Sequence, residues 1–304
     1  MGMKTTTNVL EFQTESQVAR RRKSILRKIP GWLAAYLTLF ALCGFILLPV
    51  GWLLAAALKP DFVPIFTQPP QWWPSNYWHW ENFARVMTNE TIPMAKYIVN
   101  TFVIVGGNMI GTLLSCSVVA YAFARLRFRG SNVLFNVLII TMLIPWQALM
   151  VPQFLMFFKF GWYGTYLPLI VPSFGGSPFY IFLIRQYMRT IPKELEDAAR
   201  VDGLNYWQSF LYIILPLSIP AITVCLVFVF LGSWSDLLGP LLYLDTNSKF
   251  TVAIGLANMA TRSGNSLWNL LMAGNLISIV PMVITYFLLQ KQLIGGIASV
   301  GLKG

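Results

Sequence analysis

Charged residues are scarce in this sequence. Asp, Glu, Lys and Arg make up 11% of the 304 residues, while 56% are hydrophobic. A water-soluble chain of this length needs far more polar surface to cover its core. The composition therefore excludes an ordinary soluble domain. A lipid bilayer removes the need for a polar surface, provided that the apolar residues form blocks of about 20.

Histidine and cysteine are also rare, and their positions exclude several kinds of site. His79 is the only histidine, so the chain cannot bind a metal through several histidines, and it has no credible nucleophile–base–acid group. Cys43, Cys116 and Cys225 lie inside apolar runs, far apart in the sequence, which suits neither a zinc knuckle nor a disulfide framework. We interpret them as small buried hydrophobic residues. We therefore expect no metal site and no catalytic residues.

A phosphate-binding motif is missing as well. The pattern Gly-x-x-x-x-Gly-Lys-Ser/Thr does not occur, so any ATP that drives this protein must bind to a partner. The net charge of +11 would suit nucleic acid, but most basic residues flank the apolar blocks, as in Arg20–Lys23 and Arg27–Lys28. Because this placement is typical of topology signals, we exclude nucleic acid as a partner.

Six apolar blocks follow a polar N-terminal segment, residues 1–28. The first block is longer than the apolar region of a signal peptide, which is about 7–15 residues, so we interpret it as a retained span despite the cleavage-like Ala55-Ala56-Ala57. In lipid each block must satisfy its own backbone hydrogen bonds, which predicts helices. The predicted fold class is all-α, a polytopic membrane protein with six transmembrane helices. The blocks are Trp32–Ala57, Tyr97–Phe123, Leu134–Phe158, Leu167–Ile184, Ile219–Tyr243 and Leu270–Leu289.

The Lys and Arg residues between the blocks predict the orientation, because cytoplasmic segments carry an excess of both. With the N-terminus inside, only six of the 22 basic residues lie outside, so we expect both termini to be cytoplasmic. The six are Lys59, Arg85, Lys96, Lys159, Lys249 and Arg262. The fourth block is short and contains three prolines and Gly175-Gly176, which predicts an irregular helix.

The segment between the fourth and fifth blocks has the pattern of two short helices joined by a tight break. The acidic residues between Glu194 and Asp197 complement the positive end of a helix dipole. Glu196 and Arg200 are spaced for a side-chain pair, and Gly203 is placed for a left-handed C-cap. Taken alone, the pattern also fits an ordinary amphipathic pair of surface helices. An apolar stripe follows at helical spacing: Leu204, Trp207, Phe210, Leu211 and Ile214.

A longer pattern in the same segment resembles the EAA loop of ABC importer permeases. It reads Asp197-Ala198-Ala199, three residues, Gly203, nine residues and Ile213-Ile214-Leu215-Pro216, with Asp197 where the family usually has Glu. The resemblance implies the type I ABC importer permease fold and a short helical elbow that docks on an ATPase. Ala198 and Ala199 would permit close approach, and the Asp197 carboxylate, one methylene shorter than Glu, would meet an arginine. The implied docking residues are Glu194, Asp197, Ala198, Ala199, Asp202 and Gly203.

Further motifs extend the resemblance to the carbohydrate-uptake branch of that family, which has maltose-type architecture. They are Trp234-Ser235-Asp236, where the branch usually has Asn in the middle, Gly239–Tyr243, and the stretch from Gln290 to Gly304. The resemblance implies a permease subunit of a binding-protein-dependent importer that forms half of the translocation path for a sugar or oligosaccharide. It also implies a C-terminal tail that reaches into the paired ATPases.

The resemblance implies an assembly in a prokaryotic cell membrane. Its other members would be a second homologous permease, two cytoplasmic ATPase subunits and an external substrate-binding protein. ATP and magnesium would bind to the ATPases, so this chain would be non-catalytic and would hold no cofactor. We expect a cytoplasmic arm at residues 1–28, a six-span domain at residues 29–290 with a coupling loop at 186–216, and a cytoplasmic tail at residues 291–304.

Asp236 is the only acidic residue within the six blocks, and such a residue is a candidate for a functional site. On a helix Phe228, Gly232, Ser235 and Gly239 share one face, which Asp236 borders. We therefore predict that Phe228, Gly232, Ser235 and Asp236 contribute to the substrate path. In the alternative interpretation Asp236 lies hydrated, or paired with a partner side chain, at the outer end of the fifth span.

The sequence leaves two questions open. The solute could instead be an amino acid, a phosphonate or a polyol, because the loop identifies the machine and not its cargo; a membrane sensor could also use the same docking loop. The aromatic segment Trp72–Trp80 could stack on sugar rings, or it could lie at the membrane interface or against an external partner.

Overall fold

The computed structural model describes the backbone of residues 4–61, 69, 71–72, 77–262 and 268–301. Within these ranges it describes the side chains from residue 31 to residue 290, except residue 262. The chain divides into two compact units, Met1–Ala55 and Ala56–Gly304. The described ranges contain helices and turns and no β-strand.

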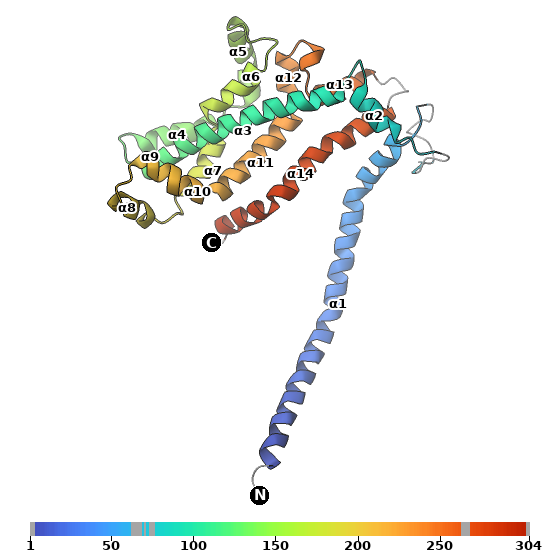
Figure 1. Ribbon diagram of the computed structural model, residues 1–304, viewed down its shortest axis with the longest axis vertical. Coiled ribbons are helices and arrows are strands. Elements are labelled where there is room, and N and C mark those ends of the chain that lie inside the picture. The colour runs from blue at the N-terminus through green and yellow to red at the C-terminus, as the bar shows by residue number, and fades with distance from the viewer. Residues whose placement is uncertain (1–3, 62–68, 70, 73–76, 263–267, 302–304) are drawn as a thin grey trace. The chain divides into compact units, whose positions relative to one another are not determined.

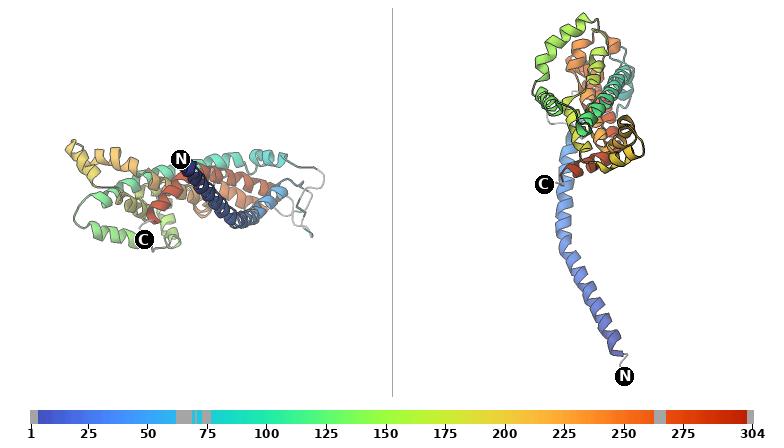
Figure 2. Two further views of the ribbon diagram at one scale, coloured as in Figure 1. Left: turned by 90° about the horizontal axis from the view of Figure 1, so that it is seen from below. Right: turned by 90° about the vertical axis from the view of Figure 1, so that its left-hand side faces the viewer.

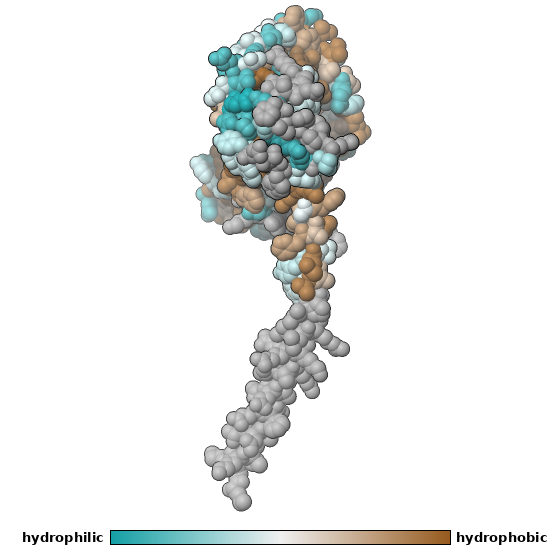
Figure 3. Space-filling model, turned by 90° about the vertical axis from the view of Figure 1, so that its right-hand side faces the viewer, coloured by the Kyte–Doolittle hydropathy of each residue, from teal (hydrophilic) through white to brown (hydrophobic). Residues whose placement is uncertain are grey.

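The described part of the first unit, from residue 4, is a single helix. Helix α1 runs from Lys4 to Ala57 over 54 residues, so the predicted arm and the first predicted span form continuous helical backbone, and residues 1–3 lie outside the described part. The surface of α1 after residue 30 is largely hydrophobic (Figure 3), with Phe40 and Phe45 each 76% exposed. Such a surface is stable in lipid and not in water, which agrees with a membrane span at Gly31–Ala57.

The second unit consists of helices of very different lengths (Figure 1). The longest are α3 (Met94–Arg125) and α14 (Trp268–Gly301), so the predicted tail is helical backbone as far as Gly301, and residues 302–304 lie outside the described part. The other elements, in chain order, are α2 (Glu81–Thr88), α4 (Ser131–Thr141), α5 (Trp146–Lys159), α6 (Leu167–Ile170), the 3-10 helix η1 (Val171–Gly175), α7 (Pro178–Met188), α8 (Glu194–Val201), α9 (Tyr206–Ser209), the π-helix η2 (Phe210–Ile214), α10 (Leu215–Leu217), α11 (Ile219–Ser235), α12 (Leu238–Tyr243), the 3-10 helix η3 (Asn247–Lys249) and α13 (Val252–Arg262).

Helix α3 is the centre of this unit. It packs against α7, η1 and α11, and α11 also packs against α14. The contact between α3 and η1 is close because Gly111 has no side chain. A Cβ at Gly111 would lie 2.1 Å from the Ser173 hydroxyl oxygen and 2.8 Å from the ring of Phe174. The small residue on α3 therefore sets how near the irregular fourth span can come.

The described residues contain four helices that are long and apolar enough to cross a membrane: Gly31–Ala57, Met94–Arg125, Leu167–Met188 and Trp268–Gln290. Two further pairs of helices meet the same criterion together but are bent. The bend between α4 and α5 is 94°, and that between Tyr206–Leu217 and Ile219–Ser235 is 73°. If each pair forms one span, the total is the predicted six. Pro145 precedes α5, so the first bend lies where proline disfavours a continuous helix.

The fourth predicted span is irregular, as its prolines and glycines indicate. It passes from α6 through η1 to Gly176, which has a φ of +83°, and continues as α7. The fifth block is interrupted too, since α11 ends at Ser235, Asp236 is extended with a ψ of 117°, and α12 begins at Leu238. Gly239 therefore lies beyond the break and does not continue the face of Phe228, Gly232 and Ser235, contrary to the prediction.

The two ends of the second unit carry different structures. Helices α8 and α9, with the predicted docking residues, lie at one end, and α2 and α13 lie at the opposite end (Figure 1). Helices α4 and α5 form an arc along one side of the unit (Figure 2), which leaves apolar residues such as Val133 exposed (66%).

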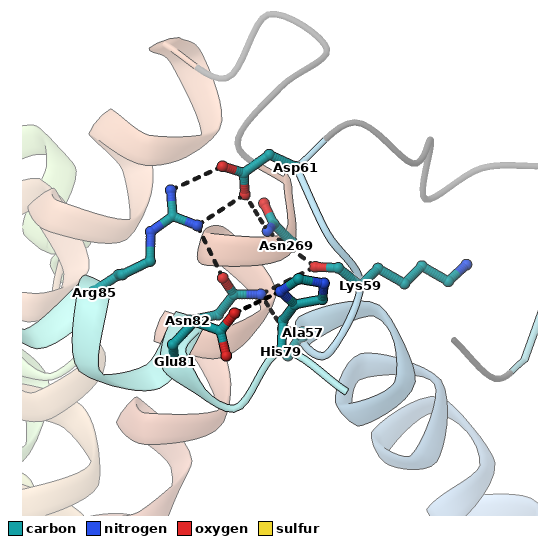
Figure 4. A network of polar contacts seen from close by, with 8 residues as sticks. All are labelled: Ala57, Lys59, Asp61, His79, Glu81, Asn82, Arg85 and Asn269. Atoms are coloured by element: carbon teal, nitrogen blue, oxygen red, sulfur yellow. Dashed lines mark hydrogen bonds and ion pairs between the residues drawn. The ribbon is translucent and has the colours of Figure 1, made fainter. Parts of the chain in front are cut away.

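At the end that carries α2, a network of polar contacts joins the first residues of the second unit, α2 and the start of α14 (Figure 4). The fully buried Asn82 donates to the carbonyl oxygen of Ala57 at 2.8 Å. Asn269 donates to Asp61 Oδ1 at 2.7 Å, and Arg85 Nη2 pairs with Asp61 Oδ2 at 2.8 Å. The hydrogen bond from Arg85 lowers the pKa of Asp61 below its usual value, so the network favours the ionised carboxylate.

Candidate functional site

The predicted docking loop consists of two short helices joined by a tight turn, so the predicted shape of this segment is confirmed. Gly203 follows α8 with a φ of +87°, a left-handed conformation that glycine adopts without strain. The turn is closed by hydrogen bonds from Gly203 N to Arg200 O at 3.0 Å and from Leu204 N to Ala199 O at 2.9 Å. These are the two bonds of a Schellman motif, which satisfies carbonyl groups at the end of a helix. Local backbone geometry therefore fixes the shape of the turn.

The second helix of the loop begins with a capping box. Gln208 N donates to the Asn205 side chain and Asn205 N donates to the Gln208 side chain, both at 2.9 Å. The backbone then becomes π-helical from Phe210 to Ile214. The predicted apolar stripe is buried only in part, because Phe210 and Ile214 are 2% and 0% exposed while Trp207 is 55% exposed. A π-helical turn is wider than an α-helical turn, so α-helical spacing does not describe this segment.

A buried ion pair holds α8 against the end of α3. Arg125 Nε lies 3.2 Å from Glu196 Oε2 in the geometry of an ion pair rather than of a hydrogen bond, and the two side chains are 2% and 6% exposed. The Tyr121 hydroxyl lies 3.2 Å from Glu196 Oε1 and 3.1 Å from the Tyr206 carbonyl oxygen, so two acceptors share its proton. The structure thus pairs Glu196 with Arg125 and not with Arg200, which was the predicted partner. Arg200 instead lies 4.4 Å from the centroid of the Tyr206 ring.

Arg125 also joins α3 to α7. Its Nη2 donates to the carbonyl oxygens of Met188, the last residue of α7, and of Ile191, each at 2.7 Å. One guanidinium therefore links the ends of two candidate spans to the docking loop. Arg125 was predicted only as one of the 16 basic residues on the cytoplasmic side, and Tyr121 was not predicted to have a role. A charge placed directly at the end of a long apolar block was the signal that could have identified Arg125.

The structure exposes most of the predicted docking residues and buries one of them. Ala199 is 5% exposed and packs against its own chain, so its side chain is not available to a partner. Ala199 was predicted to permit close approach of an ATPase, whereas in the structure it permits close contact of α8 with the rest of this chain. Val201, which was not among the predicted docking residues, adds an apolar surface to α8 and is 88% exposed. The exposed members of the predicted set are Glu194, Asp197, Ala198, Asp202 and Gly203.

Three of the four predicted substrate-path residues share the accessible face of α11. Phe228 is 47% exposed, and Gly232 and Ser235 are exposed too, whereas the neighbouring Trp234 is 3% exposed. Asp236 is half-buried and has a different role in the fold: its Oδ1 accepts a hydrogen bond from Gly239 N at 3.1 Å, next to the start of α12. The predicted path residues are therefore adjacent, but the Asp236 carboxylate is partly engaged by backbone.

The described residues contain no group of three His, Cys, Asp or Glu side chains that could hold a metal ion. His79 Nδ1 lies 2.6 Å from Glu81 Oε1, within the polar network at the end that carries α2 (Figure 4). Cys116 and Cys225 are buried as predicted, whereas Cys43 is exposed, because it lies in a unit that consists of a single helix. Residues 73–76 of the aromatic segment lie outside the described part, so the function of that segment stays a prediction.

Comparison with known proteins identifies the family. The family described as "Binding-protein-dependent transport system inner membrane component" matches residues 107–298. The arabinooligosaccharides transport system permease protein AraQ of Halalkalibacterium halodurans is 39% identical over 193 residues, which is 64% of this chain and 68% of that protein. The osmoprotective compounds uptake permease protein GgtD of Synechocystis sp. is 30% identical over 297 residues, which is 94% of this chain and 97% of that protein.

The fold agrees with these relatives. In the crystal structure of a bacterial ABC transporter involved in the import of the acidic polysaccharide alginate, one chain matches with a TM-score of 0.73 at 22% identity, covering 87% of this chain and 96% of that chain. The family pattern covers more than half of this chain and includes α8, α11 and most of α3. The chain therefore belongs to the inner membrane components of binding-protein-dependent transport systems, the permease subunits of ABC importers.

Proposed function

We propose that this chain forms half of the translocation path of an ABC importer for a sugar or oligosaccharide, and that it couples to ATPases through the loop Glu194–Pro216. The similar protein AraQ is named for arabinooligosaccharide transport, and the similar fold belongs to a transporter of a polysaccharide, which supports a carbohydrate. The observation that carries the coupling proposal is the exposed helix α8, held on α3 by the buried pair of Arg125 and Glu196.

The coupling follows from how α8 is attached. An ATPase that moves α8 would move Glu196, and through Arg125 it would move the ends of both α3 and α7. Breaking the buried pair is costly, so the loop transmits displacement as a rigid lever rather than by bending. The exposed Asp197 carboxylate and the apolar Val201 would form the contact with the ATPase. Such a contact drives transport only if it differs in free energy between the inward-open and outward-open states.

The proposed assembly adds a second homologous permease, two ATPase subunits and an external binding protein. A second permease would supply the other half of the path. In this chain the candidate surface that lines the path is the accessible face of α11, with Phe228, Gly232 and Ser235. ATP and magnesium would bind to the ATPases alone. The orientation inferred from the basic residues would place α8 and both termini in the cytoplasm, and α2 on the side of the binding protein.

The docking proposal is tested by two variants of the loop. Asp197→Lys reverses the charge of an exposed side chain, and Gly203→Pro cannot adopt the φ of +87° that the turn needs. We expect both variants to insert in the membrane but to lose the ATPase subunits on purification and to stop transport. Glu90→Lys is the matched control, because Glu90 is an exposed acid at the other end of the unit. Normal co-purification of the ATPases with both loop variants would refute the docking proposal.

The substrate-path proposal is tested on α11. Gly232→Leu places a bulky side chain on the accessible face, where a Cβ meets no atom within 4 Å in this chain, so the isolated fold should tolerate it. We expect loss of uptake with normal assembly of the complex. Asp236→Asn should reduce uptake only if the carboxylate faces the substrate; if it serves the backbone at Gly239 alone, uptake should stay unchanged. Normal uptake by both variants would remove these residues from the path.

A second candidate function is supported by one comparison. The relative GgtD, which aligns over almost the whole chain, is named for osmoprotective compounds. Uptake of labelled sugars, polyols and amino acids by the assembled complex separates the two candidates, since the complex should accumulate its own solute class alone. Hydrolysis of ATP by the complex without movement of any solute would favour the sensor interpretation instead.

A further inference from the structure

A basic cavity lies beside the docking loop and shares Arg125 with the proposed coupling. Its volume is about 680 Å³, and it is lined by the end of α3, the connection to α4, the first turn of α4 and the end of α7. No acidic residue lines it. Five basic residues do: Arg125, Arg127, Arg185, Arg189 and Lys193.

Most of the positive charge around this cavity has no acidic partner. Glu196 pairs with Arg125, whereas no other basic residue of the cavity forms an ion pair in the described part of the chain. Arg185 is held in place, with its guanidinium carbon 3.8 Å from the centroid of the Phe135 ring and its Nε donating to the carbonyl oxygen of Phe123 at 3.2 Å. Like charges gathered around one cavity repel each other, and a bound anion removes that repulsion.

The cavity lies at the ends of two candidate membrane spans. Arg125 ends the candidate span Met94–Arg125, and Arg185 lies in the last turn of the candidate span Leu167–Met188. Helix α4 begins at the cavity and exposes an apolar surface along the arc seen in Figure 2. A ligand with an anionic head and apolar chains therefore meets a matching surface at both ends. The exposed apolar residues of α4 are Val133 (66%), Leu134 (53%), Val137 (52%) and Ile140 (59%).

We propose that this cavity binds the phosphate headgroup of an anionic phospholipid, whose acyl chains lie on the exposed face of α4. Arg185 presents a preorganised guanidinium, and the exposed Arg127, Arg189 and Lys193 reorient around the phosphate. A free phosphate ion has the same headgroup chemistry, but it leaves the apolar face of α4 uncovered. Lys193 immediately precedes α8, so the bound lipid holds the docking loop at the membrane surface.

The test uses the assembled importer, purified in detergent and stripped of lipid. Phosphatidylglycerol is titrated in and counted by native mass spectrometry, with phosphatidylcholine as the neutral lipid. In the double variant Arg127→Gln/Arg189→Gln both positions are exposed, so the fold is not at risk. Arg129→Gln is the matched control, since Arg129 is an exposed arginine of the same connection that does not line the cavity.

We expect one phosphatidylglycerol per chain in the unaltered protein and in the Arg129→Gln control. The double variant should bind it about thirtyfold more weakly, which is the loss expected for two basic residues near a membrane surface. Phosphatidylcholine should not bind at this site, and inorganic phosphate should not compete with the lipid. The measurement is of binding, so its result does not depend on which solute the importer carries.

Three results would overturn the proposal. Equal lipid binding by the double variant and the control would remove the cavity as the site. Full competition by inorganic phosphate would assign the cavity to a free anion. The third result would be a loss of the ATPases. Arg127 also borders a second cavity of about 320 Å³, together with Glu196 and Asp197, under the docking loop. If the double variant lost its ATPases but kept its lipid, the cavity would belong to a subunit interface.

Discussion

The pair of Arg125 and Glu196 offers the sharpest test of how the docking loop is attached. Replacing Glu196 by Leu removes the carboxylate and leaves a charged guanidinium whose side chain is 2% exposed. Removing one partner of a buried pair costs about 3–5 kcal/mol, because the remaining charge is buried without a counter-charge. Arg125 keeps its bonds to the carbonyl oxygens of Met188 and Ile191, so we expect the lower end, about 3 kcal/mol.

This loss of free energy should destabilise the attachment of the loop to α3 rather than the fold of the whole protein. Once α8 leaves α3, the Arg125 guanidinium is hydrated again, so local opening is the less costly response. Hydrogen exchange of the amides in residues 194–206 should therefore rise about a hundredfold in Glu196→Leu, while that in α11 stays unchanged. Glu194→Leu is the control, because Glu194 is an exposed acid of the same helix.

The double variant Arg125→Met/Glu196→Leu separates the charge from the packing. With both charges gone, no buried ion is left unpaired, and part of the protection should return. The recovery is incomplete because the carbonyl groups of Met188 and Ile191 lose their donor. If the single variant exchanged at the rate of the unaltered protein, or if the double variant exchanged as fast as the single one, the ion pair would not be what attaches the loop.

Three further predictions concern the backbone and the polar network. Gly111→Ala should lower the thermal midpoint of the purified chain, at a cost of about 1–3 kcal/mol, while Gly106→Ala in the same helix should not, because its Cβ meets no atom within 4 Å; equal midpoints would refute the close contact with η1. Gly203→Ala should cost about 1–2 kcal/mol, measured by exchange in the loop, because the φ of +87° and not a clash opposes the methyl group; unchanged exchange would contradict this. Asp61 has a lowered pKa in the folded state, so its contribution is present above the unfolded value, about 3.9, and is lost as the pH falls through the folded value. The thermal midpoint should thus fall between pH 7 and pH 3 by an amount that Asp61→Asn removes, about 1 kcal/mol at most for this exposed pair with Arg85; the same pH dependence in the variant would exclude Asp61 as its origin.

The class of the protein, the turn at Gly203 and the irregular fourth span could be predicted from the sequence because they depend on local properties. Apolar blocks need lipid wherever they lie in the fold, and Gly203 ends a helix through its own φ. The same reasoning predicted the irregular fourth span from its prolines. It did not predict that the fifth block breaks at Asp236, because the hydrogen bond from Gly239 that accompanies the break is one of several local alternatives.

What only the tertiary structure decided is which side chains meet. The spacing of Glu196 and Arg200 allowed a pair within one helix. Glu196 instead contacts Tyr121, 75 positions earlier, and Arg125 on the same helix α3. The burial of Ala199 has the same origin, since α8 turns that side towards the rest of the chain. A sequence pattern shows which residues are neighbours along one helix, but not which residues of different helices meet. An ion pair that is buried between helices is costly to break. The sequence by itself therefore determined a membrane permease and predicted an elbow that docks on an ATPase, and the packing of α3, α7 and α8 decided how that elbow is attached.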